Sequence, residues 1–178
     1  MRPSSSSGVG IELVSRYPER VRALVAHEPP LARLLDDADK DVALWEEVYD
    51  TYRSEGVGPA MGKFLASAGL ERSAPQPPSD STPEVAEAMA QAQKNPVFFL
   101  GHMWLPMVDY APDVGRLRSL PIEVAVGEAS EGQLAYRAGV AVAEQLGKET
   151  TIFPGDHGGF LSHPEAFAAR LDEVFSAY

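Results

Sequence analysis

The chain has 178 residues, of which 44% are hydrophobic and 23% are charged, as is typical of a soluble protein with one compact domain. Its 26 acidic and 15 basic residues give a formal net charge of -11, which repels nucleic acids and anionic membranes, so neither is expected as a partner. Cysteine is absent, and this excludes disulfides, thiolate metal sites and thiol catalysis. Because no long apolar run or signal-peptide pattern is found, a cytoplasmic protein is expected.

The N-terminal part of the sequence predicts a helix followed by a buried strand. Apolar residues at intervals of four indicate a helix over 8–17, which Pro18 ends. A continuous apolar run then predicts a strand over 21–27, stopped by Pro29 and Pro30. A short, continuously apolar strand is typical of a parallel sheet that is covered on both faces.

The middle of the chain has a helical period instead. Apolar residues recur at helical spacing over 31–110, and a proline-rich linker over 73–81 interrupts them. Strand patterns return at 121–126 and at 149–153.

Helices are predicted around the last two strands. A helix over about 131–146 follows the second strand, and Ser130 is expected to cap it. A last helix is predicted from Ser162 onward. Strands and helices thus alternate on both sides of the helical block, which predicts an α/β fold with a short parallel sheet. Residues 1–30 and 111–178 would form the core, and 31–110 would be inserted as a helical lid.

His157 is the histidine whose surroundings favour acid–base chemistry. It follows a predicted strand in a glycine-rich loop, at the sheet edge where α/β proteins bind ligands, and an imidazole titrates near neutral pH. His27, His102 and His163 are interpreted as structural from their surroundings. No spacing of His, Asp and Glu indicates a metal site, and no cofactor is expected.

Three segments, in this order, resemble the α/β-hydrolase family. They are Tyr-Pro-Glu-Arg-Val-Arg-Ala-Leu-Val at 17–25, Pro-Ile-Glu-Val-Ala-Val-Gly-Glu at 121–128 and Phe-Pro-Gly-Asp-His-Gly-Gly at 153–159. The resemblance covers essentially the whole chain and matches the C-terminal two thirds of such a protein. It implies a truncated three-layer fold that keeps the last three strands of the family's sheet and lacks the loop that supplies an oxyanion-hole amide.

The resemblance implies that Ser4 is the nucleophile, from its position ahead of Pro18. Arg2 and Ser6 stand where the family has glycines around a sharp turn. Because Ser4 begins a run of four serines, Ser5 or Ser6 could take the role if the turn were reshaped. The alternative is a polar terminus without a catalytic role.

The resemblance also implies that His157 is the general base and that a carboxylate orients it. Most members place an aspartate where this chain has Ser130. A subset instead uses a glutamate at the end of the strand that follows the nucleophile helix, and this position is Glu28. Glu128 remains the alternative acid, and Glu28 could instead serve only to cap the turn before Pro29.

A serine–histidine–glutamate set implies hydrolysis of a small hydrophobic ester, lactone or thioester. The candidate substrate-binding residues come from the lid: Trp45, Phe98, His102, Met103 and Trp104. The alternative function is a non-hydrolytic relative that binds a small hydrophobic ligand or uses His157 in acid–base chemistry, alone or completed by a partner chain. Since the strand over 21–27 would have an unpaired edge, a homodimer through this strand is expected.

Overall fold

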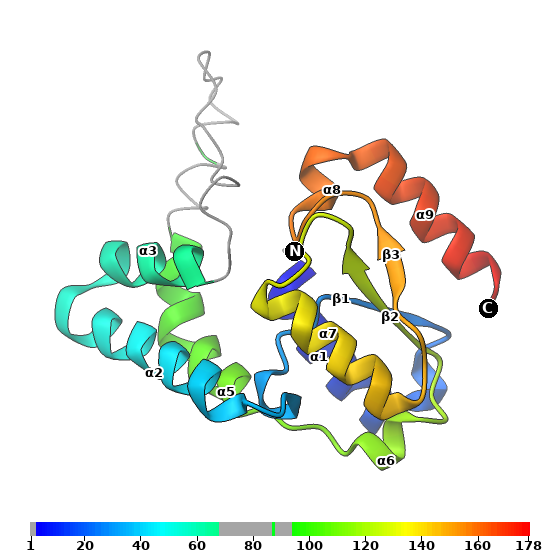
Figure 1. Cartoon of the computed structure of the whole chain (residues 1–178), viewed down its shortest axis with the longest axis horizontal. Coiled ribbons are helices and arrows are strands. Elements are labelled where there is room, and N and C mark those ends of the chain that lie inside the picture. The colour runs from blue at the N-terminus through cyan, green and yellow to red at the C-terminus, as the bar shows by residue number, and fades with distance from the viewer. Residues whose placement is uncertain (1–2, 68–86, 88–93) are drawn as a thin grey trace.

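The computed structural model of this chain describes residues 3–67, 87 and 94–178, with side chains from Ser7 onward. The linker predicted over 73–81 lies outside the described residues. In Figure 1 a small sheet lies between helices, and a separate group of helices (α2, α3 and α5) lies beside it. The division into a core over 1–30 and 111–178 and an inserted helical block over 31–110 stays a prediction. A lid function for the second group stays a prediction.

The sheet has three parallel strands in the order β1-β2-β3. Their bounds are β1 (Leu24–His27), β2 (Ile122–Gly127) and β3 (Thr151–Phe153). Each is a short apolar run that a turn or a proline pair ends, as expected for strands covered on both faces. The predicted α/β class with a short parallel sheet is confirmed, and the architecture is consistent with an α/β-hydrolase-like fold.

Helices precede, separate and follow the strands. They are α1 (Pro3–Arg16), α2 (Ala38–Glu55), α3 (Val57–Ser67), α5 (Trp104–Val108), α6 (Val114–Leu117), α7 (Leu134–Leu146), α8 (Gly159–Ser162) and α9 (Pro164–Ser176). Three shorter segments are the 3-10 turns η1 (Pro18–Arg20) and η2 (Ala32–Leu34) and the π-helix η4 (Phe99–Met103). The first helix therefore begins earlier than predicted, and the first strand begins at Leu24 rather than at Val21.

The sheet has a different set of helices on each face. On one face Ile11 of α1 and Val142 of α7 pack with Val124 of β2 in one buried cluster. On the other face Phe167 of α9 packs with Phe153 of β3. Successive side chains of a strand point to opposite faces, so the continuously apolar strands supply both clusters.

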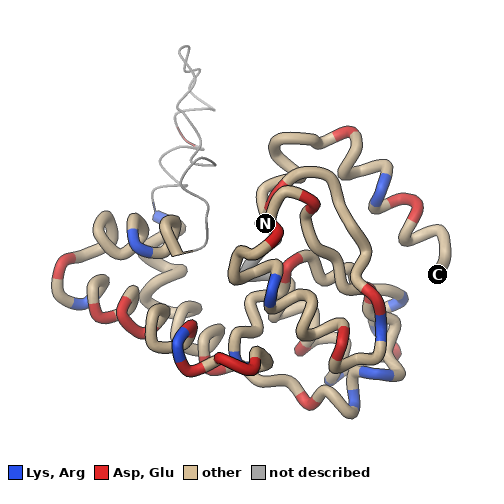
Figure 2. Tube along the Cα trace, in the orientation of Figure 1, with Lys and Arg blue, Asp and Glu red and all other residues tan. Residues whose placement is uncertain are grey.

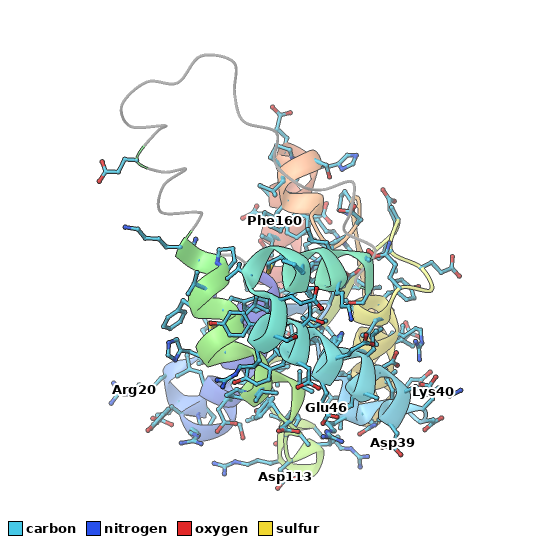
Figure 3. All side chains as sticks on the ribbon, turned by 90° about the vertical axis from the view of Figure 1, so that its left-hand side faces the viewer. Arg20, Asp39, Lys40, Glu46, Asp113 and Phe160 are labelled. Atoms are coloured by element: carbon cyan, nitrogen blue, oxygen red, sulfur yellow. The ribbon has the colours of Figure 1, made fainter. Side chains whose placement is uncertain are left out.

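The helical group around α2 has a core of its own. Trp45 and Trp104 are 3% and 0% exposed, and the Trp104 indole N–H donates to the carbonyl oxygen of Trp45 at 2.8 Å. Charged side chains such as Asp39 and Glu46 lie on the outer face of this group in Figure 3. Figure 2 shows that acidic residues occur along the length of α2.

None of the helices within the described ranges is both long and apolar enough to cross a membrane.

Candidate active site

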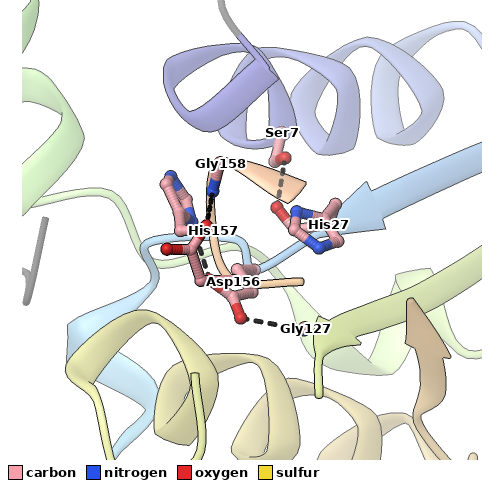
Figure 4. Close-up of polar contacts among 7 residues, drawn as sticks. Ser7, His27, Gly127, Asp156, His157 and Gly158 are labelled. Atoms are coloured by element: carbon pink, nitrogen blue, oxygen red, sulfur yellow. Dashed lines mark hydrogen bonds and ion pairs between the residues drawn. The ribbon is translucent and has the colours of Figure 1, made fainter. Parts of the chain in front are cut away.

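A buried carboxylate and a histidine meet where β1 and β3 end (Figure 4). The Oε2 atom of Glu28 lies 2.7 Å from Nδ1 of His157. The Glu28 side chain is 0% exposed and that of His157 is 11% exposed. Glu28 directly follows β1, and His157 lies in the loop after β3, so the parallel sheet brings residues 129 positions apart to one edge.

The backbone holds Glu28 in an uncommon conformation. Its φ of 44° is the only positive φ among the described non-glycine residues. Such a conformation persists only where surrounding contacts fix it. The Glu28 N–H donates to the carbonyl oxygen of Ala125 at 2.8 Å, and its Oε1 accepts from the Gly127 N–H at 2.9 Å. Both contacts come from the neighbouring strand β2.

The surroundings of Glu28 favour its ionised form. Burial acts to raise the pKa of the Glu28 carboxyl, but His157, the Ser130 hydroxyl and the Gly127 N–H outweigh it and hold this pKa below its ordinary value. Glu28 is therefore a carboxylate at neutral pH. Since a carboxylate can only accept, the proton of this contact belongs on Nδ1 of His157, which leaves Nε2 free to accept a proton.

Two glycines allow the His157 loop to lie against the end of β2. A Cβ atom at Gly127 would approach the carbonyl oxygen of Gly155 to 2.6 Å and Ser130 Oγ to 2.9 Å. Gly155 itself has a φ of 79°, which favours glycine. Further along this loop Asp156 Oδ1 accepts from the Gly158 N–H at 2.8 Å. The loop position, and with it that of His157, depends on these small residues.

A second histidine, His27, is buried near His157. It is 4% exposed, and its ring makes edge contacts with Phe153 and Phe167 and lies 6.1 Å from the His157 ring, centroid to centroid. Within the described part of the chain neither ring nitrogen has a hydrogen-bond partner. Burial lowers the pKa of His27 to about 4, so the ring is neutral at pH 7.

Of the three catalytic candidates, the structure shows two in contact. Ser4 lies in the first turn of α1, and its side chain falls outside the description, so its role stays a prediction. The alternative acid Glu128 is exposed, and its Oε1 accepts from the Gly155 N–H at 3.3 Å. Glu128 therefore supports the loop, whereas Glu28 contacts His157.

The five predicted substrate-binding residues occupy different surroundings. Trp45 and Trp104 belong to the core of the helical group, so they form no open surface. Phe98 is 59% exposed and lies 5.2 Å from His102, ring centroid to ring centroid. His102 and Met103 line a groove with a volume of about 530 Å³. Among the described residues, none of the five makes a ring contact or a hydrogen bond with His157.

The groove lies between α1, the turn after β1 and the segment formed by η4 and α5. Its walls are mostly apolar, and it is lined by Gly8, Val9, Glu12, Leu13, Arg16, Tyr17, Pro30, Leu31, His102, Met103, Pro106, Met107 and Tyr110. The Tyr110 hydroxyl donates to Glu12 at 2.6 Å within it. The groove is therefore an apolar surface with a polar site at Tyr110 and Glu12.

Sequence reasoning missed three residues that support the pair. Ser130, expected at a helix cap, is 0% exposed and lies beside Glu28. Helix α7 begins at Leu134 after Gln133, with no side-chain cap. Gly127 had a visible signal, a glycine at the end of a strand. The contact of Ser7 with the carbonyl of His27 had none.

No group of three or more His, Cys, Asp or Glu side chains in the described ranges is arranged to hold a metal ion.

The chain is similar to two curated hydrolases, although no family model matches it. It is 28% identical over 181 residues to the uncharacterized hydrolase YraK of Bacillus subtilis (strain 168) and 27% identical over 178 residues to the zearalenone hydrolase of Bionectria ochroleuca. Each alignment covers 96% of this chain and 60% of the relative. The chain thus spans about 60% of the length of these relatives.

Proposed function

We propose that this chain belongs to a serine hydrolase of the α/β-hydrolase type that cleaves a small hydrophobic ester, lactone or thioester. In this proposal Ser4 is the nucleophile, His157 the general base and Glu28 the residue that orients His157. The observation that carries the proposal is the 2.7 Å contact between a fully buried Glu28 and His157. The names of the two hydrolase relatives support the general reaction type.

The proposed reaction is acyl transfer to water. The Ser4 hydroxyl oxygen attacks the substrate carbonyl while Nε2 of His157 takes its proton, and the same proton then passes to the leaving alcohol or thiol. Water attacks the acyl-enzyme in the second half, again with proton transfer through His157, and the carboxylic acid leaves. Glu28 keeps the proton on Nδ1 and stabilises the imidazolium that forms in each half. A serine nucleophile favours carbonyl substrates over alkyl halides, for which an aspartate is suited.

A fluorophosphonate probe tests this assignment, because it forms a covalent bond only with an activated serine. We expect stoichiometric labelling of the wild-type chain at Ser4, identified by peptide mass spectrometry. Ser4→Ala should abolish the labelling, and His157→Ala should slow it by at least about 10³-fold. Ser54→Ala, which changes an exposed serine on α2, should label as the wild type does. Labelling that persists in Ser4→Ala, or no labelling of the wild type, would refute the assignment.

The groove beside α1 favours a second candidate function, the binding of a small hydrophobic ligand without hydrolysis. Three large side chains remain open to solvent on this side, Val9 at 60% and Leu13 at 48% on α1 and Tyr17 at 51% directly after it. Met103 and Met107 also line the groove, and a methionine side chain adapts its shape to different ligands. The volume of about 530 Å³ is within the range of small-molecule sites.

Titration with a neutral solvatochromic dye such as Nile red tests this second function. We expect saturable fluorescence enhancement by the wild-type chain and about tenfold weaker binding by Leu13→Gln, because one fully buried leucine contributes about 1.5 to 3 kcal/mol. The control is Leu161→Gln, since Leu161 is 65% exposed and does not line the groove. Equal binding by both variants would place the dye elsewhere and exclude the groove.

A further inference from the structure

The hydroxyl of Ser7 joins helix α1 to the end of strand β1. Ser7 is 5% exposed, and its Oγ donates to the carbonyl oxygen of His27 at 3.1 Å across a separation of 20 residues. Figure 4 shows this contact. The local sequence does not predict this contact. A serine in a helix commonly donates to a carbonyl of its own helix, as Ser54 does to Asp50.

The carbonyl that Ser7 contacts faces away from the sheet. The N–H groups of Leu24 and Glu28 donate to β2, and backbone groups alternate in direction along a strand, so those of His27 point to the opposite side. β1 is an edge strand with β2 as its single neighbour in the described sheet. The Ser7 hydroxyl therefore takes the place that a further strand would occupy. It provides a hydrogen-bond donor for the backbone carbonyl of His27, which is a buried residue.

This carbonyl belongs to the same peptide group as the N–H of Glu28. The group is held from both sides, because Ser7 donates to its oxygen and its N–H donates to Ala125 at 2.8 Å. The adjoining torsion is the positive φ of Glu28. The two contacts thus fix the orientation of the His27–Glu28 peptide plane, and with it the direction in which the Glu28 side chain points toward His157.

We propose that Ser7 is a positioning residue that sets the place of Glu28 relative to helix α1. Ser7 lies one turn after Ser4 on this helix, so its hydroxyl fixes the helix of the proposed nucleophile to the strand end that carries the acid. Ser7 acts through the His27–Glu28 peptide and takes no part in bond making. The expected effect on hydrolysis rests on the proposed function. The effect on the contact between Glu28 and His157 can be measured without any hydrolytic activity.

The test compares Ser7→Ala with Ser7→Thr in the full chain. Proton NMR of the wild type should show a strongly downfield resonance for the His157 Nδ1 proton shared with Glu28. Ser7→Ala should move this resonance upfield or broaden it beyond detection, and Ser7→Thr, which keeps the hydroxyl, should restore it. For hydrolysis of an activated ester, Ser7→Ala should lower kcat by about 10- to 100-fold with little change in KM. Ser54→Ala, which removes an exposed hydrogen bond of the same type, is the control.

Each outcome of this comparison decides the inference. An unchanged resonance in Ser7→Ala overturns it, as does fluorophosphonate labelling at Ser7 itself. A displaced resonance that threonine restores supports it, even if the wild type hydrolyses no ester, in which case only the proposed function fails. If Ser7→Ala does not fold, Ser7→Cys replaces it. The thiol is a weaker donor, so an intermediate displacement supports the inference and an unchanged resonance overturns it.

Discussion

Replacing Glu28 by glutamine should lower the rate of ester hydrolysis by about 10⁴-fold while the chain stays folded. The glutamine oxygen can still accept from the Gly127 N–H, which now bonds Oε1 at 2.9 Å. Its amide group is uncharged, so it neither stabilises the imidazolium nor requires the proton to be on Nδ1 of His157. The measurement is kcat/KM for an activated ester, together with the circular dichroism of the variant.

Glu128→Gln is the matched control for this substitution. Glu128 is the alternative acid of the sequence analysis. It is exposed, and its carboxylate accepts from the loop amide of Gly155. We expect it to lose less than about tenfold in kcat/KM, because a neutral oxygen can also accept from this amide. A larger loss in Glu128→Gln than in Glu28→Gln would transfer the role to Glu128.

The stability of the protein should fall as the pH is lowered below about 6.5, and His27 should cause much of the fall. Burial lowers its folded-state pKa from an ordinary 6.5 to about 4. Between these two pH values the histidine is protonated in the unfolded chain but stays neutral in the folded chain. The free energy of unfolding should therefore decrease by about 2 kcal/mol between about pH 7.5 and pH 5, and by about 3 kcal/mol by pH 4.

Urea unfolding of the wild type and of His27→Phe at several pH values measures this contribution. Phenylalanine fits the contacts with Phe153 and Phe167 and has no nitrogen to protonate, so the variant should lack most of the pH dependence above pH 5. Glu28, whose folded-state pKa is also lowered, adds stability that is present above its ordinary value of 4.5 and is lost as the pH falls below it. In the control His163→Gln, the free energy of unfolding should depend on pH as in the wild type, because His27 is still present. If His27→Phe shows the same pH dependence as the wild type, His27 is not its cause.

The strands could be predicted from the sequence because each is a continuous apolar run with a clear end. Pro29 and Pro30 stop β1, and Gly127 ends β2. The pairing of Glu28 with His157 followed from the resemblance, which placed both at the carboxyl ends of their strands. The structure brings these two together at 2.7 Å.

The supporting contacts could not be predicted because they depend on residues far apart in the chain. Ser130 has the spacing of a capping residue, yet it lies buried beside Glu28. A helix cap contributes only about 1 kcal/mol, so the packing around the buried carboxylate decides its place. Similarly, the apolar period of α1 indicates a helix but does not show that Val9 and Leu13 remain exposed in an open groove.

The separations within the site also bear on how the protein folds. Glu28 bonds Gly127 across 99 residues and His157 across 129, and contacts between distant residues form after local helices because long loops must first close. Helices such as α2 can form early in refolding, whereas the carboxylate and imidazole meet only when all three strands have paired. Recovery of the Glu28–His157 contact would therefore report completion of the core, later than the recovery of helical signal.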